Sequence, residues 1–173
     1  MKRTICFVLF LAATSALAQD KNPVTSVVKE ILPRRQRNLV AAVEEMPADK
    51  FAYKPTEQQV TFGHLVLHIV ESNNSLCSTI GDLPEVKAPV PLKESDGKEK
   101  LVAALKASFD FCTAALAKVD DSKLADEVEM YGRKGTRAFA LIALTNDWAD
   151  HYSSAAMYLR LNGMLPPTAQ PKK

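Results

Sequence analysis

The three histidines of the chain fall in two segments with helical periodicity. His64 and His68 are four residues apart, and Asp147 and His151 repeat that spacing further along the chain. Residues four apart share one face of an α-helix. Imidazole and carboxylate groups that meet between two helices suit zinc, iron, nickel or manganese. The sequence therefore predicts a divalent metal site between two facing helices.

A purely structural interpretation of Asp147 and His151 stays open beside this one. The two residues interrupt an apolar stripe whose other members are Ala140, Leu144, Trp148, Ala155 and Leu159. Buried polar groups need partners. A hydrogen bond between the aspartate and the histidine would satisfy much of that need without any ion.

Other residues that could do chemistry form weaker patterns. Glu71 follows His68 by three residues, as in half of a di-metal carboxylate site. The segment from His64 to His68 lacks the glutamate that zinc proteases place after the first histidine. Residues 132–135 lack the ending of a phosphate-binding loop and predict a turn instead.

The first 18 residues have the pattern of a secretory signal peptide. Lys2 and Arg3 precede a short apolar run, and the small residues at 16 and 18 predict cleavage after Ala18. The apolar run is too short to span a membrane, so we expect a periplasmic or secreted protein with no membrane span. Cleavage would remove two of the 22 basic residues of the full chain, which leaves 20 basic and 20 acidic residues. A neutral chain without interleaved basic and aromatic residues argues against nucleic-acid binding.

Export leaves two cysteines, Cys77 and Cys112, in an oxidising compartment. Their spacing matches no metal or redox motif. A disulfide between them and two buried free thiols both fit the sequence.

Four helical stretches separated by proline-bearing loops are expected to position these residues. The first covers about 24–46, and Pro33 predicts a kink or a new start within it. The second covers about 61–78 and is capped by Thr61, and the third runs from a cap at Ser95 or Asp96 to Val119. The fourth runs from near Gly135-Thr136 to Asn162, where Gly163 ends it. Strand-type alternation is nearly absent. The sequence predicts an all-α protein with one four-helix-bundle domain over residues 19–168 and a polar tail over 169–173.

In this order the segments resemble the DinB-like superfamily of four-helix bundles, which includes metal-dependent hydrolases and thiol-dependent transferases. The resemblance covers about residues 24–168. Its most specific part is Asp150-His151-Tyr152 with the later Tyr158 to Gly163 and Pro166-Pro167, and it also uses 38–47, 51–55, 61–68 and 101–116.

The resemblance implies a metal triad of one histidine from the second helix and two, four apart, from the last. By position these are His68, Asp147 and His151, with aspartate where the family usually has histidine. Aspartate also ligates divalent ions, and His64 is an alternative donor. Glu71 or Asp150 would act as general base on an ion-bound water. The substrate is an unidentified small molecule, and the resemblance is compatible with a homodimer.

Two functions follow as hypotheses. The first is an exported metal-dependent hydrolase or thiol transferase. The second is a non-catalytic binding module that keeps the bundle but has lost chemistry with the missing histidine.

Overall fold

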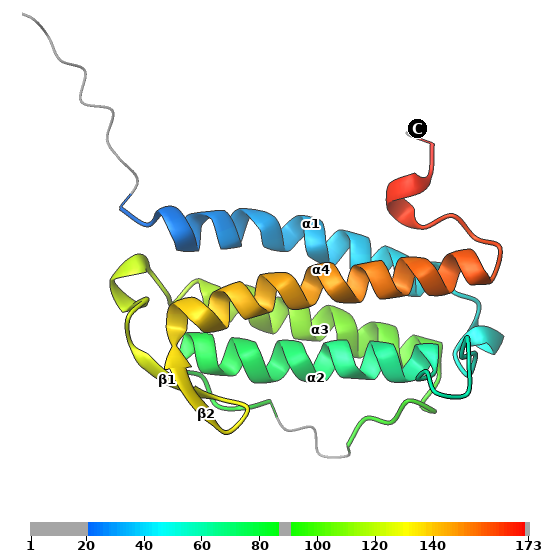
Figure 1. The fold of residues 1–173 in the computed structure, drawn as a ribbon, viewed down its shortest axis with the longest axis horizontal. Coiled ribbons are helices and arrows are strands. Elements are labelled where there is room, and N and C mark those ends of the chain that lie inside the picture. The colour runs from blue at the N-terminus through cyan, green and yellow to red at the C-terminus, as the bar shows by residue number, and fades with distance from the viewer. Residues whose placement is uncertain (1–20, 87–90, 172–173) are drawn as a thin grey trace, which may run out of the picture.

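The fold is taken from a computed structural model that describes residues 21–86 and 91–171. The signal peptide expected at residues 1–18 lies outside the described residues. Four long helices dominate the rest (Figure 1): α1 (Pro23–Glu45), α2 (Phe62–Gly81), α3 (Lys98–Leu116) and α4 (Arg137–Leu161). The expected all-α four-helix bundle is thus confirmed.

The helices run up, down, down and up along the bundle. In Figure 1, α1 and α4 point one way and α2 and α3 point the other way. Both α2 and α1 pack against α3 and α4, so α2 and α4 are antiparallel neighbours. The end of α2 and the start of α3 lie at opposite ends of the bundle, so those two helices are parallel. None of the described helices is both long and apolar enough to cross a membrane.

Two helix starts follow their predicted caps and a third does not. The side chain of Thr61 accepts the N–H of His64 at 3.0 Å, and Thr136 caps α4 in the same way. The expected cap of α3 at Ser95 or Asp96 is wrong, because the N-cap is Gly97 at φ 87°. Asp96 instead accepts the backbone N–H of Lys93 at 2.9 Å, so its carboxylate closes the preceding turn.

Pro33 does not divide the first helix, which is continuous from Pro23 to Glu45. Of the two alternatives at Pro33, a kink or a new start near Arg34, the new start is therefore wrong. Buried residues lie on both sides of the proline, among them Leu32 and Leu39. Burying each such side chain contributes about 1.5–3 kcal/mol, which offsets the roughly 3 kcal/mol that an interior proline costs.

The expectation of almost no strands is also wrong, for one short segment. Strands β1 (Glu127–Met130) and β2 (Arg133–Thr136) form an antiparallel hairpin before α4. Its two-residue turn places Tyr131 at φ 51° and Gly132 at φ 70°. Two positive φ values match the twist of a hairpin, so the predicted turn within 132–135 has become the turn and second strand of a hairpin.

A disulfide between Cys77 and Cys112 joins α2 to α3. Both cysteines are fully buried within the core. Of the two alternatives that the sequence left open, the structure has the bridge. A closed loop of 35 residues stabilises the fold by roughly 3–4 kcal/mol in the chain-entropy account.

The first turn of α1 is held by a distant carboxylate. Asp121 accepts the backbone N–H groups of Val24 at 2.9 Å and Thr25 at 2.8 Å. In return, the N–H of Asp121 donates to the side chain of Asn22 at 3.0 Å. The residues after α3 thus cap the start of α1, which aligns these two antiparallel helices.

This cap predicts an acid-sensitive stability. Burial works toward a higher pKa for Asp121, but the bonds from Val24 and Thr25 outweigh it and hold the pKa below its ordinary value of 3.8. As the pH falls, the carboxylate of Asp121 takes up its proton in the unfolded chain before it does so in the folded protein. The stabilisation by this cap is therefore complete above the ordinary pKa and is lost as the pH falls through the lower pKa of the folded protein. We expect urea unfolding at about pH 7 and pH 3 to show a larger acid loss for the wild type than for Asp121→Asn.

The exposed Asp110 on α3 offers a matched control for this measurement. Asp110→Asn should lose as much stability in acid as the wild type does. Equal losses in the wild type and in Asp121→Asn would contradict the prediction.

Candidate metal centre

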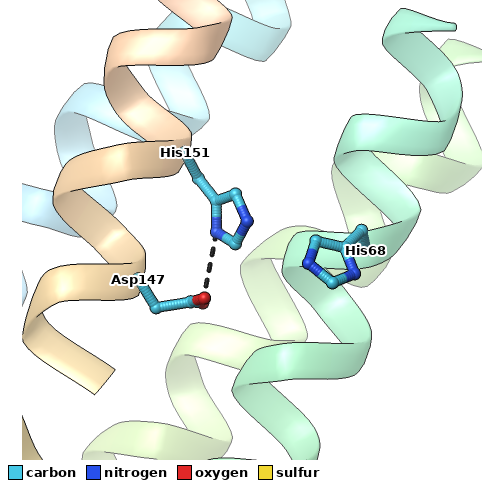
Figure 2. A group of neighbouring side chains, drawn as sticks. All are labelled: His68, Asp147 and His151. Carbon is cyan, nitrogen blue, oxygen red and sulfur yellow. Dashed lines mark ion pairs between the residues drawn. The ribbon is translucent and has the colours of Figure 1, made fainter. Parts of the chain in front are cut away.

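Three side chains from α2 and α4 meet at the border of the bundle. His68 comes from α2, and Asp147 and His151 come from successive turns of α4 (Figure 2). One ligand atom from each residue lies within 4.8 Å of the other two. The structure thus brings together the three residues that the family resemblance implied.

The three residues differ in their access to solvent. His151 is buried, the side chain of Asp147 is 22% exposed, and His68 is exposed. The group is therefore anchored in the core on the α4 side and open to solvent on the α2 side.

Asp147 and His151 are close but do not satisfy each other. Their Oδ2 and Nδ1 atoms form an ion pair at 3.1 Å when the ring is protonated. The two atoms are not aligned as a hydrogen bond, and each is buried without a hydrogen-bond partner among the described residues. The mutual hydrogen bond of the structural interpretation is therefore not formed.

The same separation fits two ligands of one ion. Atoms each about 2.1 Å from a shared metal lie roughly 3.0–3.5 Å apart, depending on the coordination geometry. A cation would also supply the partner that both buried atoms need. His68 faces this pair, with its ring edge-on to that of His151 at a centroid distance of 4.9 Å (Figure 2).

Contacts along the α2–α4 interface fix the level at which these side chains meet. In the core, the indole N–H of Trp148 donates to the side-chain oxygen of Asn73 at 2.7 Å. Nearer the start of α2, the hydroxyl of Tyr158 donates to the carbonyl of Val60 at 2.6 Å. At the opposite end, the buried guanidinium of Arg137 donates to carbonyl oxygens in the last turn of α2. The two helices are thus held at three levels, with the metal-ligand candidates between them.

The other predicted site residues lie apart from this group. His64 is exposed, and its ring pairs with Glu94 of the α2–α3 connector at 3.1 Å. Glu71 and Asp150 are both exposed on the surface and are not members of the three-residue group. The possible role of His64 as a ligand and the general-base roles of the two acids stay predictions.

Tyr131, at the tip of the hairpin, is a neighbour of the site that sequence reasoning missed. Its hydroxyl lies near Ser72 of α2 and near Asp147, and burial followed by the negative charge of Asp147 raises the pKa of the phenol. The only signal in the sequence was an aromatic residue directly before the glycine of the turn, which carries no chemistry until the hairpin folds back.

Together, fold and site define a class: an up-down-down-up helical bundle with a His-Asp-His group that could hold a metal ion between antiparallel helices. The family model of the DinB superfamily matches residues 31–153. Because this match spans well over half of the chain, the protein belongs to the DinB superfamily.

Solved structures agree on the fold. A DinB-like protein from Bacillus subtilis is similar at a TM-score of 0.67 and 20% identity, covering 84% of this chain and 99% of that chain. A DinB-like protein from Bacillus cereus is similar at a TM-score of 0.68 and 15% identity, covering 82% and 95%. No curated protein sequence matches the chain at a significant level.

The left-handed backbone of Tyr131 allows a test of whether its side chain stabilises the folded protein. A left-handed φ costs a residue other than glycine about 1 kcal/mol or more, and asparagine tolerates it best. We expect Tyr131→Asn to unfold at the same temperature as the wild type or a higher one, measured by circular dichroism. Gly132→Ala, at φ 70°, should lower that temperature. A large loss in Tyr131→Asn would show that the ring stabilises the hairpin.

Proposed function

We propose that the protein binds one divalent metal ion through His68, Asp147 and His151 and uses it to hydrolyse a small molecule. The observation that carries the proposal is the pair of Asp147 and His151, whose facing atoms are buried, 3.1 Å apart and without hydrogen-bond partners. Two imidazoles and one carboxylate are a common donor set for zinc, iron, nickel and manganese.

The chemistry expected of such an ion is to lower the pKa of a bound water and polarise a substrate atom. Three protein donors leave a position for that water or atom. We propose that this water or atom would bind on the side of His68, which is exposed. Glu71 and Asp150 are the acids we propose for proton transfer, one on each helix of the site.

The Cys77–Cys112 disulfide favours hydrolysis over thiol transfer. Structural disulfides persist in oxidising compartments, where small reduced thiols are scarce. A transferase that consumes such a thiol would lack its co-substrate there. We therefore place metal-assisted hydrolysis first.

Metal titration tests the centre directly. We expect isothermal titration of the apo protein with Zn²⁺ to give one site. His68→Ala, Asp147→Asn and His151→Ala should each weaken it by at least about 10- to 100-fold, because the loss of even a second-sphere partner has that effect. His64→Ala tests the alternative donor one turn away on α2. Because the ring of His64 pairs with Glu94 instead, we expect this variant to leave the affinity unchanged.

The apo protein should stay folded in this experiment, because its core is apolar and closed by a disulfide. Circular dichroism checks this for each variant. With bound metal, hydrolysis of a panel of chromogenic esters, amides and phosphoesters should disappear on chelation and in His151→Ala. Sub-stoichiometric metal binding that is unchanged in the ligand variants would favour the non-catalytic module.

We also propose that the protein is exported after cleavage of residues 1–18. The disulfide supports this, together with the basic start and apolar run of the segment. N-terminal sequencing of the protein from the extracytoplasmic fraction should begin at Gln19. An uncleaved chain that stays in the cytoplasmic fraction would refute export.

A further inference from the structure

A hollow of about 640 Å³ lies between the hairpin and the first turns of α4. Val128, Met130 and Phe139 line it with apolar atoms, and Tyr131 and Arg133 stand at the hairpin tip. Figure 1 shows the hairpin at the end of the bundle where α4 begins. The hollow is separate from the three metal-ligand candidates, but it shares Tyr131 with their surroundings.

The strand register places Arg133 and the glutamates of β1 on opposite faces of the hairpin. Val128 pairs with Gly135, and Met130 pairs with Arg133. Paired residues lie on the same face of an antiparallel ladder, so Val128, Met130 and Arg133 share one face. The glutamates of β1, Glu127 and Glu129, lie on the other face. No acidic residue of the described chain lines the hollow.

Arg133 carries the uncompensated charge of this hollow. Lys134, the other cation in the lining, is paired with Glu127 at 2.7 Å. Arg133 forms no ion pair with any residue that the structure describes, and it is exposed. A guanidinium with free donors beside an apolar wall is suited to a carboxylate.

The backbone at the start of α4 does not compete for such an anion. The N–H of Arg137 donates to the carbonyl of Asp126, and the N–H of Ala138 donates to the carbonyl of Leu124. The N–H of Phe139 donates to the side chain of its N-cap. Recognition of an anion in this hollow therefore falls to the side chain of Arg133.

Two aromatic rings at the hollow are unusually open for their size. Tyr131 is 66% exposed and Phe139 is 58% exposed. Exposed apolar surface that gathers around one concave region is typical of a ligand site. The rings can cover the apolar body of a molecule whose charged end reaches Arg133.

The hollow also lies within reach of the metal-ligand candidates. Asp147 follows Phe139 by eight residues on α4, which is about 12 Å along the helix axis. Tyr131 lines the hollow, and its hydroxyl lies near Asp147, so this one side chain connects the two places. A molecule of roughly that length can occupy both places.

We propose that this hollow binds the substrate of the metal centre, and that the substrate is a small organic acid with an apolar or aromatic body. Arg133 binds its carboxylate, Met130 and Phe139 contact its body, and the remainder passes Tyr131 toward Asp147. The assignment of this acid as the substrate rests on the proposed function, whereas its binding to the hollow does not.

The charge requirement is tested with 3-phenylpropionate and its neutral amide as probes, titrated into the apo protein by calorimetry. We expect the acid to bind about tenfold more tightly than the amide, since a hydrogen bond to a charged partner contributes at least that much. Arg133→Gln should bring the two affinities within about twofold of each other. Phe139→Ala should weaken both probes alike.

Arg160 provides the matched control, because it is an exposed arginine near the other end of α4. Arg160→Gln should keep the preference for the acid. Equal binding of acid and amide by the wild type, or a preference that survives Arg133→Gln, would overturn the anion site. Thermal unfolding of each variant guards against misfolding, which exposed substitutions should not cause.

The link to the metal centre needs a separate readout. With Mn²⁺ bound, the protons of 3-phenylpropionate should broaden in NMR spectra, and this broadening should vanish in His151→Ala while calorimetric binding persists. Binding without broadening in the Mn²⁺ protein would overturn the substrate assignment. Failure of both Zn²⁺ and Mn²⁺ to bind would refute the proposed metal function, while the acid–amide comparison still decides the anion site.

Discussion

The candidate site depends on the register between α2 and α4, and a buried hydrogen bond between Trp148 and Asn73 holds that register. The indole N–H donates to the side-chain oxygen of Asn73 at 2.7 Å, and the amide group of Asn73 donates to Ser108 of α3 at 2.9 Å. A slip of one turn, about 5.4 Å, would leave these groups unpaired in the core. It would also separate His68 from His151, whose ring centroids are 4.9 Å apart. Apolar packing alone would distinguish such registers poorly.

The bundle has an apolar core and a polar border between α2 and α4, and the two differ in what they contribute. The core has its own apolar residues and a disulfide, so we expect it to fold without an ion. Asp147 and His151 lie where α4 meets α2, with two buried atoms that lack partners. The hairpin adds Tyr131 in a left-handed conformation beside them. Unpaired polar atoms and a left-handed backbone both cost stability, and both are present at this border of the bundle.

The sequence predicted those features that depend on interactions between residues close in the chain. It did not predict those that depend on tertiary contacts. Helical periodicity and the caps at Thr61 and Thr136 predicted their helices, because both act within a few residues of the chain. The hairpin was missed because each strand has four residues and only Val128 is buried, which is too little for a strand pattern. The restart at Pro33 was wrong because the burial of Leu32 and Leu39 is a tertiary effect.

The sequence by itself determined the class of fold, the neutral charge of the chain without residues 1–18, and the residue types available for chemistry. The spacing of Asp147 and His151 placed both on one face of one helix, which is a property of helix geometry. Only the tertiary structure decided that His68, and not His64, faces that pair, and that Cys77 bonds to Cys112. It alone placed Tyr131 beside Asp147. These contacts join residues far apart in the chain, and their distances depend on how helices pack rather than on sequence spacing.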